Sequence, residues 1–181
     1  MSLEKIELWD AYDKDMNKTG DILVRGKEIP NGLYHLACEV IVKHIDGTYL
    51  ITKRDLNKSV WPGYWEIGSG GSALKGESSI DCITRELEEE TGISLKNLVK
   101  HNETDNNYFK EIDYRILEKD KTLFFTFLCI TDIDKNKIIL QEGETIAYEW
   151  LTKKEILEFV LSKKAIPKQV ERCEKYLEKL Y

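Results

Sequence analysis

The chain has 181 residues, of which 41% are hydrophobic and 33% are charged, as in a soluble globular protein and unlike an intrinsically disordered one. Lys and Arg number 27 against 33 Asp and Glu, so the net charge is −6. This balance argues against non-specific nucleic-acid binding, which needs a basic face, but it allows a phosphate substrate because bound cations can reverse the local field.

Two β-hairpins are predicted in the first third of the chain, joined by a linker rich in Gly and Pro. The four strands are residues 5–12, 21–25, 35–44 and 48–54, and the linker is residues 25–32. In the second hairpin the Asp46-Gly47 pair predicts a type I′ turn.

A long helix is predicted next, after a short strand near residues 64–68 and a glycine-rich turn. It begins at Ser78, where Ser78-x-x-Asp81 resembles a capping box, and ends near Thr91 before Gly92. Later strands are predicted at 97–104, 108–116, 122–132 and 145–151, and later helices at 153–162 and from Pro167 onward. Interleaved strands and helices imply a mixed sheet covered by helices, with the first hairpin as an extension.

The long helix concentrates carboxylates on one side. At about 100° per residue, Glu86, Glu89 and Glu90 fall in one arc, and Glu88 lies apart, facing solvent. The adjacent apolar arc, expected to face the core, consists of Ile80, Ile83 and Leu87. Three carboxylates at the rim of a core repel one another, and hard oxygen ligands of this kind suit Mg²⁺ or Mn²⁺.

A wider motif contains these glutamates. From Gly71 the sequence reads GSALKGESSIDCITRELEEETGI, which fits G-x5-E-x7-R-E-U-x-E-E-x-G-U at every specified position, U being a bulky aliphatic residue. The chance of this match is on the order of 10⁻¹⁰ per starting position. The motif resembles the Nudix box, and the resemblance extends over residues 34–151, about two-thirds of the chain.

The resemblance implies a fold and a division of the chain. The fold would be of the α/β (α+β) class, an α/β/α sandwich with a mixed central sheet, the box forming a loop, a helix and a loop. We expect a hairpin extension and linker at residues 1–33, a Nudix domain at 34–165 and a C-terminal helix at 166–181 packed on that domain.

The resemblance also implies chemistry: metal-dependent hydrolysis of a diphosphate linkage, usually in a nucleoside diphosphate derivative, by attack of water on phosphorus. The cofactor would be Mg²⁺ or Mn²⁺. Glu86, Glu89 and Glu90 would hold the metal with the backbone carbonyl of Gly71 or its neighbour, Arg85 would orient the glutamates, and Glu77 would assist from the loop.

The general base and the substrate contacts have alternatives. Glu86 or Glu144 could take the proton from water, and Glu144 could equally be an ordinary loop residue. Arg54 could contact a phosphate, pair with a box glutamate or be an exposed cation at a strand end. Trp61, with its neighbours Tyr64 and Trp65, could stack on a base, close the mouth of the site or pack in the core.

Two other functions stay open. The run from HLACEVIVKH to WPGYW also resembles isopentenyl-diphosphate isomerase, but Gly70 and Ser72 stand where that family has its catalytic Cys and a metal-binding His. We interpret His35, another match to a metal ligand of the isomerases, as structural. A third hypothesis is a non-catalytic nucleotide-sensing module, against which the intact box argues.

Location and partners follow from weaker signals. The N-terminus has no basic region followed by an apolar stretch, and no uncharged apolar run approaches the ~18 residues of a membrane span, so we expect a cytoplasmic protein without membrane contact. Four cysteines without a CxxC pair argue against a zinc site or a disulfide framework. The expected partner is a small diphosphate. The first hairpin would cover the site or a second copy in a homodimer.

Overall fold

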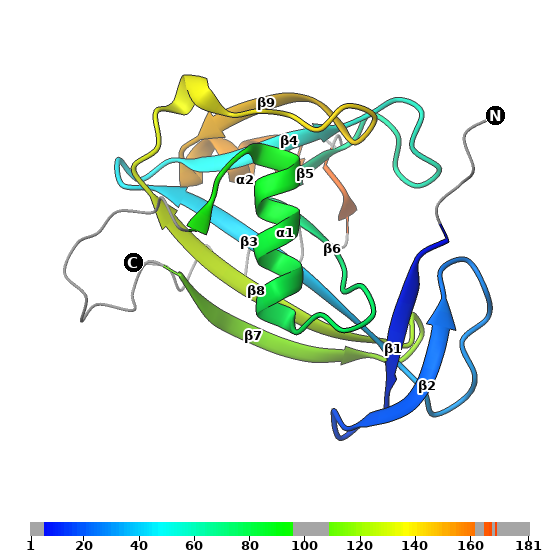
Figure 1. Cartoon of the computed structure of the whole chain (residues 1–181). Coiled ribbons are helices and arrows are strands. Elements are labelled where there is room, and N and C mark those ends of the chain that lie inside the picture. The colour runs from blue at the N-terminus through cyan, green and yellow to red at the C-terminus, as the bar shows by residue number, and fades with distance from the viewer. Residues whose placement is uncertain (1–5, 96–108, 162–164, 168, 170–181) are drawn as a thin grey trace. The chain divides into compact units, whose positions relative to one another are not determined.

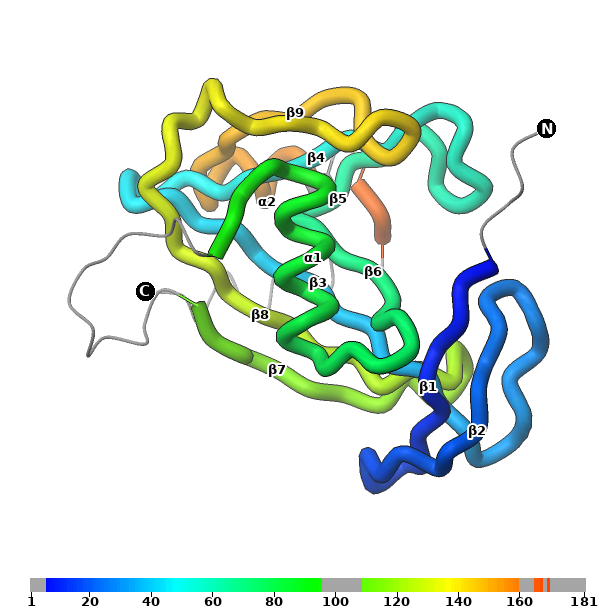
Figure 2. The backbone as a smooth tube through the Cα atoms, in the orientation of Figure 1, coloured from blue at the N-terminus to red at the C-terminus, as the bar shows by residue number. Residues whose placement is uncertain are grey.

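A computed structural model describes residues 6–95, 109–161, 165–167 and 169 (Figure 1). The chain divides into two compact units. Unit 1 consists of residues 1–39, 70–86 and 111–127, and unit 2 of residues 40–69, 87–110 and 128–181. Strands β3 (His35–His44) and β8 (Thr122–Thr131) and helix α1 (Ser79–Thr91) each contribute residues to both units. Figure 2 shows the backbone trace of these elements.

The N-terminal hairpin of unit 1 is confirmed. Strand β1 (Leu8–Tyr12) pairs antiparallel with β2 (Lys18–Val24), which begins earlier than predicted. The inward side chains of Trp9, Ala11 and Leu23 form a small core against which Ile29 and Leu33 pack. Period-2 alternation in a half-buried strand explains why these residues point inward while Ile22 is exposed.

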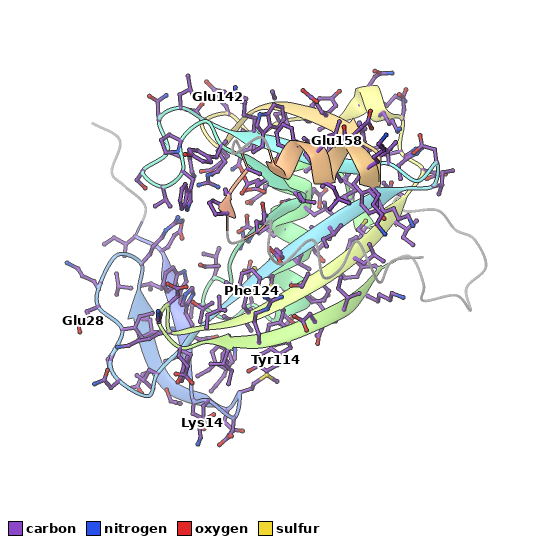
Figure 3. The ribbon with its side chains drawn as sticks, turned by 180° about the vertical axis from the view of Figure 1, so that it is seen from behind. Lys14, Glu28, Tyr114, Phe124, Glu142 and Glu158 are labelled. Atoms are coloured by element: carbon purple, nitrogen blue, oxygen red, sulfur yellow. The ribbon has the colours of Figure 1, made fainter. Side chains whose placement is uncertain are left out.

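The rest of unit 1 is built on the first part of β3. Strand β6 (Ser69–Ser72) pairs with β3, and β8 lies between β3 and β7 (Phe109–Leu117). Tyr114 of β7 contacts Phe125 of β8 with ring centroids 4.8 Å apart, and Figure 3 labels Tyr114 and the neighbouring Phe124 on these strands. The predicted glycine-rich turn before the helix is wrong in part, because residues 69–72 form a strand.

Helix α1 follows the predicted local signals. Ser78 Oγ accepts a hydrogen bond from Asp81 N at 3.2 Å while Ser78 N donates to the Asp81 carboxylate at 3.0 Å, and Gly92 after the helix has φ +73°. Ile83 and Leu87 are buried, but Ile80 is 56% exposed, so its predicted place in the core is wrong. Because helical side chains tilt toward the N-terminus, a side chain in the first turn points beyond the residues that the later turns contact.

Unit 2 is organised around β4 (Tyr49–Arg54), which pairs antiparallel with β5 (Trp65–Ile67) and β9 (Thr145–Leu151). Helix α2 (Lys153–Leu161) follows β9, and a short 3₁₀ helix spans Lys135–Lys137. The predicted type I′ turn between β3 and β4 is wrong. Asp46 has no positive φ, and His44 N bonds to Thr48 O at 2.8 Å, so the loop is longer and Gly47 alone takes the left-handed conformation.

The observed elements confirm the predicted mixed α/β fold with an N-terminal hairpin. The strand predicted at 97–104 and nearly all of the helix predicted from Pro167 lie outside the described residues, as does Cys173. Cys38, Cys82 and Cys129 are buried and free. Within the part of the chain that is described, no helix is long and apolar enough to cross a membrane.

Candidate active site

Arg85 of α1 organises the candidate site in unit 1. Its Nε donates to Glu77 Oε1 at 2.7 Å and its Nη2 to Glu77 Oε2 at 2.9 Å, a bidentate pair. Its Nη1 donates to Glu86 Oε1 at 2.8 Å, and Nη2 also reaches the carbonyl of Ser72 at 3.2 Å. One guanidinium therefore connects Glu77 in the loop before α1, the Ser72 carbonyl at the end of β6, and Glu86 on the helix.

We call the contacts of Arg85 with Glu77 and Glu86 the arginine clasp. The pKa values of Glu77 and Arg85 both favour the charged form of each side chain. Burial raises the pKa of Glu77, but the hydrogen bonds from Arg85 and from Leu74 N and the charge of Arg85 outweigh burial and hold the pKa below its ordinary value of 4.5. The pKa of Arg85 is raised, first by its hydrogen bonds to Glu77 and then by Glu86, against the effect of burial. Both groups are therefore charged at neutral pH.

The glycines of β6 make room for this arrangement. A Cβ on Gly71 would lie 2.2 Å from Glu86 Oε1, so the carboxylate rests directly against the backbone of the strand. Gly71 does not have a positive φ, which means that space and not backbone conformation requires glycine here. A Cβ on the preceding Gly70 would lie 2.4 Å from the carbonyl oxygen of Cys38.

The later box glutamates belong to unit 2. Glu90 is only 8% exposed and accepts a hydrogen bond from Ser69 Oγ at 2.5 Å, while Glu88 and Glu89 are exposed. The prediction that Glu88 faces solvent is thus confirmed. Glu86, Glu89 and Glu90 occupy positions i, i+3 and i+4 of one continuous helix, which places them along one helical face.

These carboxylates suit a hard divalent cation in charge and ligand type. The backbone of β6 at Gly71 lies directly beside the Glu86 carboxylate, and the Gly71 carbonyl accepts a hydrogen bond from Cys82 Sγ at 3.6 Å. Among the described residues, however, no group of three or more His, Cys, Asp or Glu side chains converges as a metal site. Glu86 is instead engaged by Arg85 and Glu90 by Ser69, so metal binding would have to exchange these hydrogen bonds for metal ligation.

A second set of charges lies in unit 2. Arg54 Nη1 donates to both carboxylate oxygens of Glu66 at 3.2 Å, and its Nε donates to Val60 O at 3.2 Å. Lys58 forms an ion pair with Glu144, and Asp55 N donates to the Glu144 carbonyl at 2.8 Å. Arg54 therefore pairs with a glutamate of β5 and not with one of the box.

The pKa of Glu66 is raised above its ordinary value of 4.5, and both of these ion pairs influence it. Burial raises its pKa, the neighbouring Arg54 and Lys58 lower it, and Glu144 raises it again. Lys58 and Glu66 were not singled out from the sequence. Their only signal is their position, in the loop after β4 and at the centre of the short strand that follows it.

The two tryptophans of the WPGYW stretch differ in environment. Trp61 is 40% exposed, has φ +51°, which is rare for a bulky residue, and meets the Tyr64 ring edge-on at 5.1 Å. Trp65 is buried and packs edge-on against Phe159 of α2 at 5.6 Å. Trp65 thus fits the core-packing alternative, and Trp61 has a face available for a ligand.

Comparison with known proteins decides the family. A family model described as NUDIX domain matches residues 33–171. The chain belongs to the Nudix family. It is 32% identical over 153 residues to a Listeria monocytogenes protein named "Uncharacterized Nudix hydrolase lmo0368", with 83% of each chain covered. It is 29% identical over 132 residues to the isopentenyl-diphosphate Delta-isomerase of Kocuria rhizophila, covering 71% of this chain and 68% of the isomerase.

Solved structures agree on the Nudix fold. DR0079 from Deinococcus radiodurans superposes with a TM-score of 0.72 at 17% identity, covering 92% of this chain and 99% of its own. A bifunctional NMN adenylyltransferase/ADP ribose pyrophosphatase from Francisella tularensis, complexed with AMP and Mn ion, superposes with a TM-score of 0.59 at 18% identity, covering 81% of this chain and 42% of that one. The similarity to proteins named Nudix hydrolases supports a pyrophosphohydrolase.

Proposed function

We propose that this Nudix protein is a metal-dependent pyrophosphohydrolase that cleaves the diphosphate linkage of a nucleoside diphosphate derivative by attack of water on phosphorus. The observation that carries the proposal is the clasp of Arg85 on Glu77 and Glu86 within an intact Nudix box. A helix that presented three glutamates only to solvent would not need a bidentate arginine or a glycine cleared for one carboxylate.

The metal-binding residues of the proposal are Glu86, Glu89, Glu90 and the backbone carbonyl of Gly71, and the ion is Mg²⁺ or Mn²⁺. Bound there, the ion would neutralise the diphosphate and lower the pKa of an attacking water. Arg85 keeps the Glu86 carboxylate turned toward β6 by its 2.8 Å hydrogen bond. Glu77 keeps the guanidinium in place.

A carboxylate must accept the proton of the attacking water. We place Glu86 first for this role and Glu144 second. Glu144 forms an ion pair with Lys58. For Glu144 to act as the base, the Lys58–Glu144 ion pair would have to break, for example because Lys58 binds a phosphate oxygen of the substrate instead.

The substrate contacts of the proposal lie in and beside the loop after β4. Trp61 offers an exposed ring for stacking on a base, and Arg54 is a cation at the end of β4. The binding of AMP by the Francisella neighbour supports a nucleotide-type ligand. Trp65 would contribute by packing beneath this loop.

The domain organisation belongs to the same proposal: a hairpin extension and linker at 1–33, a catalytic domain at 34–165 and a terminal helix at 166–181. The match of the Nudix model to residues 33–171 supports the start of the catalytic domain.

Isomerisation of isopentenyl diphosphate is the second candidate, because the chain resembles proteins with that name. The structure gives a reason to rank it lower. The position matching the catalytic thiol is Gly70, where even a Cβ would lie 2.4 Å from the Cys38 carbonyl. Cys38 itself is buried, and its hydrogen bond with Cys82 and its burial raise the pKa of its thiol.

The test is a screen of nucleoside di- and triphosphates, nucleotide sugars, dinucleoside polyphosphates and NADH with Mg²⁺ or Mn²⁺, read out as phosphate or pyrophosphate release. On the substrate found, Glu89→Gln and Glu90→Gln should each lower turnover at least ~100-fold with the fold retained. Glu88→Gln, on the same helix but off the metal-binding face, is the matched control and should keep wild-type turnover. Equal turnover in all three variants would refute the metal assignment. Conversion of isopentenyl diphosphate to its dimethylallyl isomer would establish the second candidate.

A further inference from the structure

The N-terminal hairpin contacts the loop between β6 and α1. All residues of this contact belong to unit 1. Strand β1 supplies two acceptors to consecutive backbone amides of this loop. The Leu8 carbonyl accepts from Lys75 N at 2.8 Å, and Asp10 Oδ2 accepts from Gly76 N at 2.9 Å. The loop between β6 and α1 is thereby held at two points by a strand far away in sequence.

Asp10 is fixed on its own hairpin. Lys18 of β2 donates to Asp10 Oδ2 at 2.6 Å, and the Asp10 side chain is largely covered although that of Lys18 is half exposed. The hydrogen bond from Lys18 is the main cause that lowers the pKa of Asp10, so the acceptor of the Gly76 amide is ionised. An ionised acceptor makes that hydrogen bond stronger than one to a neutral oxygen.

Strand β1 is itself anchored to β3. The Trp9 ring stacks on His35 with centroids 4.2 Å apart and planes 17° apart, and Tyr12 exchanges two backbone hydrogen bonds of 2.9 Å with Tyr34. Strand β1 is therefore packed against β3. The tip of the hairpin, which carries Lys14, extends into solvent (Figure 3).

From Gly76 the contacts lead through Glu77 and Arg85 to Glu86. Glu77 follows Gly76, and its carboxylate accepts from Leu74 N at 2.8 Å, which closes the loop on itself. The same carboxylate holds Arg85, and Arg85 holds Glu86. An unbroken series of contacts therefore joins Asp10, the loop, Glu77, Arg85 and Glu86.

We propose that Asp10 is a positioning residue for the Nudix site: by holding the Gly76 amide, it fixes the loop that carries Glu77 and so sets the orientation of Arg85 and Glu86. This inference rests on the proposed hydrolase function. It assigns the hairpin a role in catalysis through the loop, in place of covering the site or contacting a second copy.

The test uses the full chain and three substitutions. Asp10→Ala removes both the Gly76 acceptor and the partner of Lys18, Asp10→Asn keeps a neutral acceptor, and Lys18→Met removes only the ion pair. Glu7→Gln is the matched control, because Glu7 pairs with Arg25 at 2.7 Å on the same hairpin. The first readout is amide hydrogen exchange at Lys75 and Gly76, which needs neither substrate nor metal.

Asp10→Ala should speed exchange at Gly76 roughly tenfold or more, since a hydrogen bond to a charged acceptor is lost. In steady-state assays it should lower kcat and raise the Mg²⁺ concentration needed for half-maximal rate, each several-fold, with little change in the substrate KM. Asp10→Asn should restore most of kcat and of the wild-type Mg²⁺ requirement. Glu7→Gln should match wild type in amide exchange, in kcat and in Mg²⁺ requirement. If Asp10→Ala does not fold, Asp10→Asn and Lys18→Met should show the same changes at smaller amplitude.

Exchange and catalysis in the Asp10 variants equal to those of Glu7→Gln would overturn the proposal. A fall in thermal stability without a change in kcat or in the Mg²⁺ requirement would also overturn it, because the role would then be structural only. Failure of the hydrolase function is distinguishable, since the wild-type protein would then hydrolyse no diphosphate in the screen. Faster exchange at Gly76 with unchanged exchange at Glu77 would mean that the loss of the Asp10 hydrogen bond is not transmitted to Glu77. This result would also refute the positioning role.

Discussion

Glu77→Gln tests the energetic importance of the arginine clasp. The substitution keeps the shape of the side chain but removes the charge that meets Arg85 at 2.7 and 2.9 Å. Both side chains are less than a quarter exposed, so the pair lies between surface ion pairs of about 0–1 kcal/mol and buried pairs whose disruption costs about 3–5 kcal/mol. Because Gln keeps one acceptor and Arg85 keeps Glu86 and the Ser72 carbonyl, we expect a loss of about 1–2 kcal/mol.

For a chain of this length that loss corresponds to a fall in Tm of about 2–8 °C at pH 7, measurable by calorimetry or circular dichroism. The sign of the pH dependence follows from the lowered pKa of Glu77. The stabilisation is fully present above the unfolded-state value of 4.5 and is lost as pH falls through the folded-state pKa. The difference in Tm between wild type and variant should therefore shrink steadily below about pH 4.5.

Glu158→Gln is a suitable control, because Glu158 makes only an exposed pair with Lys154 at 3.8 Å, and its Tm should equal that of wild type. The same Tm for Glu77→Gln and wild type at pH 7 would refute the reasoning. So would a difference that persists unchanged to pH 3.5, since the effect would then not come from the Glu77 charge.

Further predictions concern separate parts of the molecule. Gly71→Ala should lower turnover at least ~10-fold with a small loss of stability, because the new methyl group must displace the Glu86 carboxylate; Michaelis kinetics and Tm check both. Burial lowers the pKa of His35 from 6.5 to about 4, so urea titrations should show stability falling by up to about 3 kcal/mol as pH decreases across that range, and His35→Gln should remove this dependence.

Local signals in the sequence predicted local structure well. The capping box at Ser78 and the glycine at position 92 set the ends of α1, since a cap and a terminator act within one turn of the helix. The turn at Asp46-Gly47 was mispredicted because the same dipeptide fits a two-residue loop and a longer loop that ends in a left-handed glycine. Strand pairing outside the turn decides between them.

Contacts between distant positions were beyond the sequence. The resemblance to the Nudix box drew attention to Arg85, Glu77 and Glu86, and in the structure Arg85 pairs with both glutamates. Lys58 meets Glu144 and Ser69 meets Glu90 only through the fold, and no periodicity relates their positions. The same limit applies to Asp10, whose role depends on a hydrogen bond to a glycine amide 66 positions later.

The tight approach of β6 to β3 also bears on how a Nudix chain could change its chemistry. At Gly70 the neighbouring carbonyl of Cys38 leaves no room for a side chain. Introducing a thiol there would first require the two strands to separate or one to shift in register, a change that a single substitution does not supply. At this position the obstacle to a reactive thiol is therefore backbone clearance, and not only the identity of the residue.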